Sequence, residues 1–126
     1  MHSEIKPQKE MNERYSEKDA MQRYMKMLGQ SRPFFLNADY NLEQFTRDLQ
    51  TNRAYASRFV NNTLGTTFPK LLQSLRLAHA ERLMHTFPEM KLSEIWQSSG
   101  FNNAVSFRRI YFNKHGQTPS ESRKGK

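Results

Sequence analysis

The sequence of 126 residues predicts an all-α fold in which two helix-turn-helix units are joined by a longer helix. Apolar residues recur at spacings of three and four along most of the chain, and no segment shows the sustained alternation of a half-buried strand. Short helices with polar N-caps and glycine stop signals occur in pairs at two places. The length fits one domain and a tail, because single domains usually contain about 100 to 150 residues.

The composition indicates a small domain with much exposed charge. Hydrophobic residues make up 36% of the chain, yet nine Phe, five Tyr and one Trp are sufficient for a compact core. The net charge is +8, and the stretch from Phe101 to Lys126 carries six Lys or Arg residues against one Glu. Such a basic concentration attracts polyanions through steering and counterion release. A basic tail kept for solubility would have the same charge, so the pattern of residues must decide the function.

The sequence lacks the features of several other protein classes. It contains no cysteine, which excludes disulfides, thiolate nucleophiles and sulfur-ligated metals. No apolar run approaches the ~18 residues of a membrane span, and no apolar signal core follows the charged start. We therefore expect a cytoplasmic protein without membrane contact, associated with the nucleoid when it is bound to DNA.

The N-terminal region divides into a polar segment and a helix. Residues 1–15 interleave Lys, Glu and Gln with isolated apolar residues and are predicted to form a flexible arm or linker. A helix is expected from Ser16, which has the spacing of a capping pair with Asp19, to Gly29. Its apolar positions are predicted to face the core, and they are Ala20, Met21, Tyr24, Met25 and Leu28.

The first helix-turn-helix is predicted at about residues 41–65, after an apolar patch at residues 34–36. Asn41 and Gln44 have the spacing of a capping box, and the helix that follows places its apolar residues on one face. After a short turn, a second helix is expected from about residue 52 to residue 64. Gly65 then occupies the C′ position that ends it.

A longer linker helix is predicted at about residues 67–86, with its regular part from Phe68 to Met84. Pro69 suits the first turn, and Pro88 prevents the helix from continuing. The candidate buried residues of this helix are Leu72, Leu75, Leu83 and Met84.

The second helix-turn-helix is predicted at about residues 92–116. A short helix begins at Leu92 and ends at Gly100, and a further helix covers residues 101–115. Gly116 provides the C-terminal stop of this further helix.

The two helix-turn-helix units correspond at an offset of 50 residues. This offset aligns Leu42 with Leu92, Asn52 with Asn102, Ala54 with Ala104 and Arg58 with Arg108. One additional residue in the turn aligns Arg58 with Arg109 and Gly65 with Gly116. Two recognition helices on one rigid body could enter successive major-groove segments, which lie ~34 Å apart on one face of a duplex. The 17 residues from Phe68 to Met84 supply about 25 Å of that distance as a helix.

The second unit and the residues after it match a family signature. The stretch SEIWQSSGFNNAVSFRRIYFNKHGQTPSESRK contains an E-I pair, a G-F pair, a Phe six residues after that Phe, a Gly and a T-P pair. These elements are Glu94, Ile95, Gly100, Phe101, Phe107, Gly116, Thr118 and Pro119. Upstream, the fitting residues are Leu42, the run Tyr55 to Phe59, Gly65, Arg76, Leu77, Ala80 and Leu83. From about Ser16 to Lys124 the chain resembles the C-terminal DNA-binding domain of AraC/XylS-type transcriptional regulators.

The resemblance implies a homeodomain-like, AraC-type DNA-binding domain at residues 16–124. The function that it implies is sequence-specific binding of double-stranded DNA for the regulation of transcription in bacteria, with each recognition helix in a successive major-groove segment. Double-stranded DNA is therefore the expected partner. RNA polymerase is a further expected partner. Residues 1–15 are typical of a connection to an upstream sensor domain, but the family resemblance also fits a complete small regulator, and the sequence leaves both alternatives open.

Helical periodicity predicts which faces of the recognition helices read DNA. The buried stripes are expected at Ala56, Phe59 and Val60 in the first helix and at Phe107, Ile110 and Tyr111 in the second. The opposite faces and their flanks give the expected base contacts, which are Ala54, Ser57, Arg58, Asn102, Val105 and Arg109. Phosphate contacts are expected from Arg53, Ser106, Arg108, Lys114 and His115.

Arg58 and Arg109 are the strongest candidates for base contacts, because a guanidinium group matches O6 and N7 of guanine bidentately. The family resemblance points to the same two positions. A phosphate contact or a solvated side chain is the competing interpretation, since at least half of protein–DNA hydrogen bonds reach the backbone. Ala54 and Val105 would offer apolar contact to a thymine methyl group.

No catalytic residue, metal site or cofactor is predicted. The sequence has no glycine-rich phosphate loop, no His-Glu metal pair and no nucleophile framed by its usual turn. His79 and His85 are six residues apart and have no Cys partner, which does not suit a metal site. Trp96 falls on the inner side of its helix, and we expect it to pack in the core. The alternative to DNA binding is a basic helical interaction module that binds an acidic protein or RNA, which explains the charge but not the repeated capped helix pairs.

Overall fold

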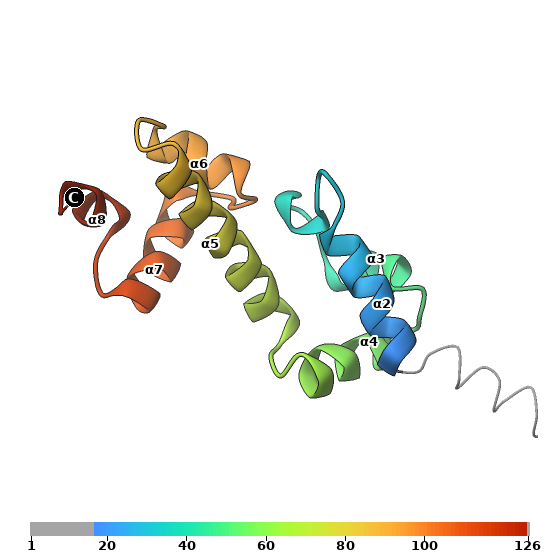
Figure 1. The fold of residues 1–126 in the computed structure, drawn as a ribbon. Coiled ribbons are helices and arrows are strands. Elements are labelled where there is room, and N and C mark those ends of the chain that lie inside the picture. Colours follow the sequence, from blue (N-terminus) through green and yellow to red (C-terminus); the bar gives the residue numbers. More distant parts are fainter. Residues whose placement is uncertain (1–16, 126) are drawn as a thin grey trace, which may run out of the picture. The chain divides into compact units, whose positions relative to one another are not determined.

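The computed structural model describes residues 17–125, and all regular elements in this range are helices (Figure 1). The prediction of an all-α fold is therefore confirmed. In chain order the elements are α2 (Glu17–Leu28), the 3-10 helix η1 (Phe34–Leu36), α3 (Leu42–Asp48), α4 (Arg53–Arg58), the π-helix η2 (Phe59–Thr63), α5 (Phe68–Thr86), α6 (Leu92–Ser98), α7 (Ala104–His115) and α8 (Pro119–Lys124).

The helices form two compact units, which we describe separately. Among the described residues, unit 1 contains residues 17–34 and the stretch Tyr40–Phe68. Unit 2 contains Phe35–Asp39 and residues 69–125. The chain thus enters unit 2 twice, first with a five-residue segment and then with α5 and everything that follows it.

Unit 1 is built around a cluster of aromatic rings. The ring centroid of Tyr24 on α2 lies 6.3 Å from that of Phe45 on α3 and 5.7 Å from that of Phe59. The ring of Phe68 lies 5.2 Å from that of Phe45, whose side chain is fully buried. Tilted and edge-on pairs at these separations are favourable beyond the burial of their area. This cluster packs α2 against α3 and against the π-helix η2.

Side-chain caps determine where the helices of unit 1 begin. Asn41 Oδ1 accepts a hydrogen bond from the Gln44 backbone N–H at 2.9 Å, and Gln44 Oε1 accepts one from the Asn41 N–H at 3.0 Å. The predicted capping box is therefore confirmed. Asn52 Oδ1 accepts from the Tyr55 N–H at 2.8 Å and caps α4 in the same way. Each cap satisfies a backbone donor that has no partner within its helix.

The second helix of the first helix-turn-helix changes its hydrogen-bond pattern partway. α4 ends at Arg58, and the chain continues as the π-helix η2 to Thr63. Gly65 follows with a φ of 68°, in the conformation expected for a residue that ends a helix. The sequence predicts a single helix that continues to residue 64. The structure corrects this expectation, because the chain changes to a π-helix at Phe59. Such turns are rare and are often found at functional sites.

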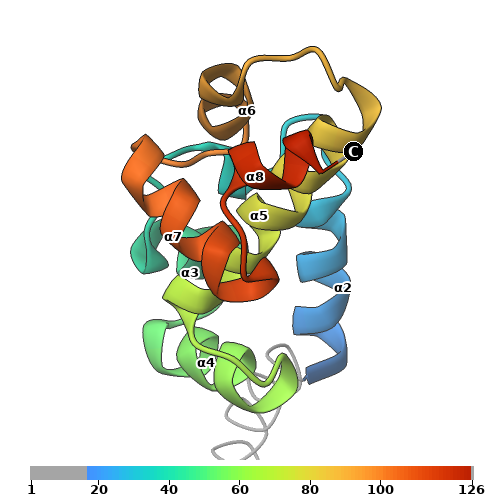
Figure 2. The same ribbon diagram turned by 90° about the vertical axis from the view of Figure 1, so that its left-hand side faces the viewer.

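Unit 2 has its core where α5, α6 and α7 meet (Figure 2). The buried members of this core are Leu77, Ala80, Ile95, Phe101, Phe107 and Tyr111. Trp96 is partly buried and packs against these residues, as predicted. The ring centroids of Phe101 and Phe107 lie 5.2 Å apart. This contact packs the turn before α7 against α7 itself.

α5 buries a different set of residues from the predicted one. Leu72 is buried as expected, whereas Leu75, Leu83 and Met84 are half-buried. The other buried residues of the helix are Leu71, Leu77 and Ala80. When a helix packs against different segments along its length, its buried residues do not all lie on one face. Helical periodicity alone then predicts the wrong set of buried residues.

In α2 the residues at the centre of the predicted stripe, Ala20 and Tyr24, are buried. Met25 is 58% exposed, because a residue one step beyond Tyr24 lies about 100° around the helix axis from it. The predicted capping role of Ser16 and the predicted arm at residues 1–15 lie outside the described residues.

α7 begins later than predicted. Asn103 Oδ1 accepts a hydrogen bond from the Ser106 N–H at 2.8 Å, so the helix starts at Ala104 and not at Phe101. The helix ends at His115, and Gly116 caps it with a φ of 72°, as expected.

The sequence prediction does not include α8. Thr118 and Glu121 form a second reciprocal capping box, with Pro119 in the first turn. The hydrogen bond from the Thr118 backbone N–H to the Glu121 carboxylate is the main cause that lowers the pKa of Glu121. Pro119 therefore starts a helix in addition to following one, and the T-P-x-E pattern is the signal that predicts it.

The segment Phe35–Asp39 is fixed to α5 and to the turn before α7. Arg76 on α5 donates from Nε to the carbonyl oxygen of Phe35 at 2.7 Å and from a terminal nitrogen to that of Asn37 at 2.9 Å. Gly100 has a φ of 90°, and a Cβ atom there would lie 2.3 Å from the same oxygen of Phe35. Glycine is therefore required at this position by both its φ and its neighbour.

Candidate nucleic-acid interface

The outer face of α7 and the turn before it carry the residues predicted to read bases. Val105 is 66% exposed, and Asn102 and Arg109 are also exposed. Phe107 and Tyr111 are buried on the opposite side, and Ile110, the third residue of the predicted stripe, is half-buried against the core. The division of α7 into a buried stripe and an outer face is thus as periodicity predicts, and the roles of the outer residues toward DNA stay a prediction.

α4 presents a corresponding face in unit 1. Ala54 and Arg58 are exposed, Ser57 is half-buried, and Ala56 is fully buried on the other side. The guanidinium carbon of Arg58 lies 5.7 Å from the centroid of the Tyr55 ring, within the range of a cation–π interaction. The aromatic ring therefore supports an arginine that points outward.

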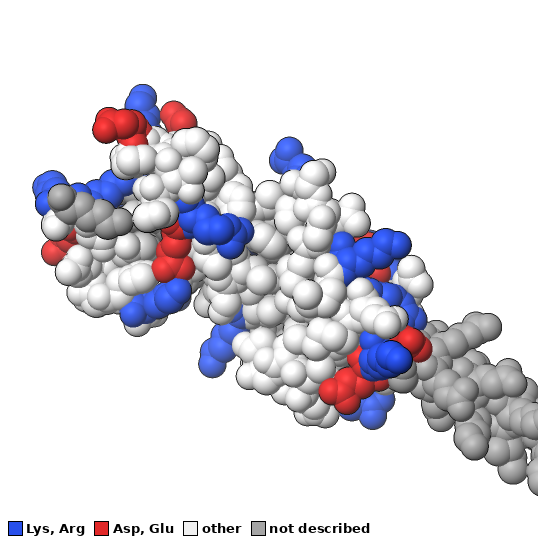
Figure 3. Space-filling model, in the orientation of Figure 1, with Lys and Arg blue, Asp and Glu red and all other residues white. Residues whose placement is uncertain are grey.

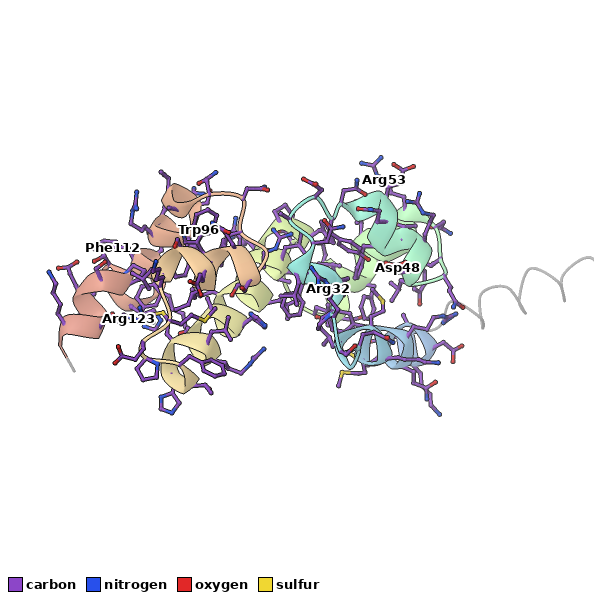
Figure 4. The ribbon with its side chains drawn as sticks, turned by 90° about the horizontal axis from the view of Figure 1, so that it is seen from above. Arg32, Asp48, Arg53, Trp96, Phe112 and Arg123 are labelled. Atoms are coloured by element: carbon purple, nitrogen blue, oxygen red, sulfur yellow. The ribbon has the colours of Figure 1, made fainter. Side chains whose placement is uncertain are left out.

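Two further arginines on the same helices were predicted to contact phosphates. Arg53 is the first residue of α4 and is exposed, and its side chain projects away from the ribbon in Figure 4. Arg108 is exposed on α7, one residue before Arg109. Both are thus accessible to a polyanion.

A surface hollow of about 120 Å³ brings three of the predicted residues together in unit 2. Asn102, Ser106 and Arg109 line it from the turn and the helix α7. Gln73 and Arg76 line it from α5. These two α5 residues are not among the predicted site residues, because their proximity to α7 arises from the packing of helices and has no local sequence signal.

Lys114 and His115, also predicted to contact phosphates, are engaged by a carboxylate of α5. Lys114 Nζ donates to both oxygens of Glu81, at 2.8 and 3.1 Å. His115 Nε2 lies 2.7 Å from Oε2 of Glu81, and its ring centroid lies 4.3 Å from that of Tyr111. A phosphate contact by either residue must therefore compete with Glu81.

Basic side chains are distributed over both units. On the face shown in Figure 3, Lys and Arg residues lie among Asp and Glu residues in each unit. On this face each unit thus offers separate basic side chains to a charged backbone.

The described residues offer no metal site of three or more His, Cys, Asp or Glu side chains. His79 Nδ1 lies 2.9 Å from Ser99 Oγ, and burial together with the charge of Arg82 lowers the pKa of His79. Its imidazole ring also packs edge-on against Phe35, at 6.1 Å between centroids. His79 thus has a packing role in unit 2. None of the helices in residues 17–125 is long and apolar enough to span a bilayer.

The chain is similar to several known proteins. A family model described as a helix-turn-helix domain matches residues 45–125. The ornithine utilization regulator of Pseudomonas aeruginosa is 34% identical over 83 residues, which make up 66% of this chain and 24% of that protein. The chain therefore spans about a quarter of the length of this relative.

Two solved structures have a similar fold. The C-terminal domain of AraT, a response regulator from Geobacillus stearothermophilus, matches with a TM-score of 0.71 and 22% identity over 86% of this chain and 85% of that one. A protein of unknown function from Listeria innocua matches with a TM-score of 0.59 and 26% identity over 71% of this chain and 84% of that one. The likeness to the AraT domain is one of fold.

Proposed function

Because the chain belongs to the AraC-type helix-turn-helix family, we propose that it binds a specific sequence of double-stranded DNA and regulates transcription, with α4 and α7 each entering the major groove. The family is one of DNA-binding regulators, and residues 45–125 of this chain form its helix-turn-helix domain. The family supports a regulatory role and not an enzymatic one.

The observation that carries the proposed geometry is the matched exposure of Arg58 and Arg109. Each lies in the second helix of a helix-turn-helix, on the side away from the buried stripe of that helix. Second helices of this motif place their exposed residues against base edges. An outward guanidinium group there reads guanine through two parallel hydrogen bonds.

We propose further that one chain reads two successive segments of the groove. α5 connects the two motifs and contains 19 residues, which corresponds to a length of about 28 Å. Successive major-groove segments on one face of the duplex are ~34 Å apart. RNA polymerase and an upstream sensor domain are partners that the family resemblance predicts. The alternative function is binding of an acidic protein or RNA by a basic helical module, and the family match favours DNA binding over it.

The first experiment compares target duplex, random duplex and structured RNA as competitors for the labelled protein–duplex complex. The proposal predicts that target duplex competes best and that random duplex follows at higher concentration. If structured RNA competes as well as target duplex, or an acidic polypeptide does, the alternative interaction module is the better account.

Salt titration provides the first quantitative prediction. The net charge of +8 and the exposed arginines of α4 and α7 lead us to expect several phosphate contacts. The observed association constant should fall with salt with a log–log slope of roughly −4 to −8, at ~0.9 per phosphate neutralised. The measurement is fluorescence anisotropy of labelled duplex over a range of salt concentrations. A slope near zero contradicts binding to a polyanion.

Glu81 gives a second prediction, because it holds Lys114 and His115 away from other anions. Glu81→Gln is expected to increase affinity for all duplex sequences several-fold and to steepen the salt dependence by about 1, as one freed cation contacts a phosphate. Glu94→Gln is the control, since Glu94 is exposed on α6 and its loss changes the net charge equally. Equal effects of the two substitutions would show that Glu81 does not compete with DNA.

A further inference from the structure

The hollow between α5 and α7 has a lining that suits an anion. Its polar residues are two arginines and three neutral hydrogen-bonding side chains, with no carboxylate among them: Gln73, Arg76, Asn102, Ser106 and Arg109. Phe101 and Ile110 supply the apolar part of its wall. Charged donors without an acidic partner form the environment in which oxyanions bind most strongly.

Arg76 supplies a fixed charge at this hollow. Two of its nitrogens donate to the carbonyl oxygens of Phe35 and Asn37, at 2.7 and 2.9 Å, which holds the guanidinium group in one position. Carbonyl oxygens carry partial charge only, so they do not neutralise it. Burial lowers the pKa of Arg76, which shows that its charge is poorly solvated. An anion in the hollow would stabilise this charge, because within residues 17–125 no ion pair links Arg76 to a carboxylate.

The position of the hollow on α7 agrees with such an anion. Asn102, Ser106 and Arg109 are four and three residues apart, so they share one flank of the helix and of the turn before it. Val105 lies on the adjoining outer face and, at 66%, is the most exposed of the large hydrophobic residues in the part of the chain that the structure describes. A helix in the major groove has a row of phosphates along each flank, while its outer face meets the base edges.

We propose that this hollow is an oxyanion site that receives a phosphate of the DNA backbone, with Gln73 and Arg76 of α5 as its inner wall. The inference rests on the proposed function and extends it, because it assigns DNA contacts to α5, outside both helix-turn-helix motifs. In this arrangement Gln73, Arg76 and Ser106 hold the phosphate, whereas Arg109 reads the neighbouring base. The phosphate thus fixes how α7 is placed along the groove.

Gln73 provides the test, because it is half-buried in the hollow and makes none of the hydrogen bonds that fix Phe35–Asp39. Gln73→Glu places a carboxylate beside the bound phosphate. We expect duplex affinity to fall about tenfold for target and random sequences alike, with a salt slope smaller by about 1. The matched control is Gln22→Glu on exposed α2 surface, which changes the net charge equally and should reduce affinity by less than about twofold.

The opposite substitution keeps the test valid if the glutamate variant unfolds. Gln73→Lys is expected to increase affinity several-fold for all sequences and to steepen the salt slope by about 1, whereas Gln22→Lys should have little effect. Thermal melting of all four variants shows which of them are folded. The expected result is that Gln73→Glu weakens duplex binding and Gln73→Lys strengthens it.

Four results would overturn the assignment. Gln73 variants that behave as their Gln22 counterparts, while wild-type protein binds duplex with the expected salt dependence, contradict this inference alone. A loss confined to the target sequence would place a base in the hollow. A third result is a saturable change of the Gln73 side-chain amide signals in nuclear magnetic resonance spectra when micromolar inorganic phosphate is added without DNA. It would assign the hollow to a free anion. A wild-type protein that does not bind duplex contradicts the proposed function as well.

Discussion

Gly100→Ala is expected to lower the free energy of unfolding by about 2 to 5 kcal/mol. Two effects add at this residue. Its φ of 90° is costly for any residue with a Cβ atom, by about 1 to 3 kcal/mol. In addition, the new Cβ atom would lie 2.3 Å from the Phe35 carbonyl oxygen and 2.9 Å from Arg76 Nε, so the segment Phe35–Asp39 must move away from α5. Chemical denaturation monitored by circular dichroism measures the loss.

Gly116→Ala is the matched control for this prediction. Gly116 has a similar backbone conformation, with a φ of 72°, but a Cβ atom there would have no neighbour within 4 Å. It should therefore show the cost of the backbone conformation alone, about 1 to 2 kcal/mol. The difference between the two variants measures the contact with Phe35–Asp39. If both variants lose the same stability, this contact contributes nothing and our account of the segment is wrong.

Arg58→Ala and Arg109→Ala are each expected to cost about 1 to 3 kcal/mol of affinity for the best sequence, which is roughly 5- to 150-fold. The loss should be much smaller on random duplex, because only a base contact distinguishes sequences. Each substitution should relax the preference at its own half of the site and leave the other half unchanged. Titration of duplexes substituted at single positions measures these differences.

Neighbouring arginines on the same helices serve as controls. Arg53→Ala on α4 and Arg108→Ala on α7 remove the same charge from exposed positions. They are expected to weaken all sequences alike and to reduce the salt slope by about 1, as does the loss of a phosphate contact. Should Arg58→Ala and Arg109→Ala also weaken target and random duplex equally, they are phosphate contacts and the assignment of base reading is wrong.

The helices whose signals lie within a few residues could be predicted from the sequence. The capping box of Asn41 and Gln44 joins residues three apart, and the stop at Gly116 depends on one residue and its φ. α7 starts three residues later than expected, because the side chain of Asn103 and not the apolar Phe101 decides where it begins. The buried and exposed faces of α7 follow from helical periodicity, which gave most of the candidate interface.

Contacts between distant residues could not be predicted in this way. Arg76 binds the carbonyl oxygen of Phe35, 41 positions away in the chain, and Glu81 binds Lys114, 33 positions away. Both contacts depend on how α5 packs against the rest of unit 2, and neither has a local sequence signal. They matter for function, because one fixes the charge at the hollow between α5 and α7, and the other pairs Lys114, which the sequence alone assigns to a DNA phosphate, with a carboxylate.

Selection of bound sequences from a random duplex pool tests the central claim most directly. If α4 and α7 of one chain each read a segment of the major groove, the selected sequences will contain two conserved centres about one helical turn apart, or 10 to 10.5 base pairs. Selection with Arg58→Ala should weaken one centre, and selection with Arg109→Ala the other. A single compact motif, or no enrichment over the starting pool while binding stays salt-dependent, would contradict reading of two groove segments by one chain.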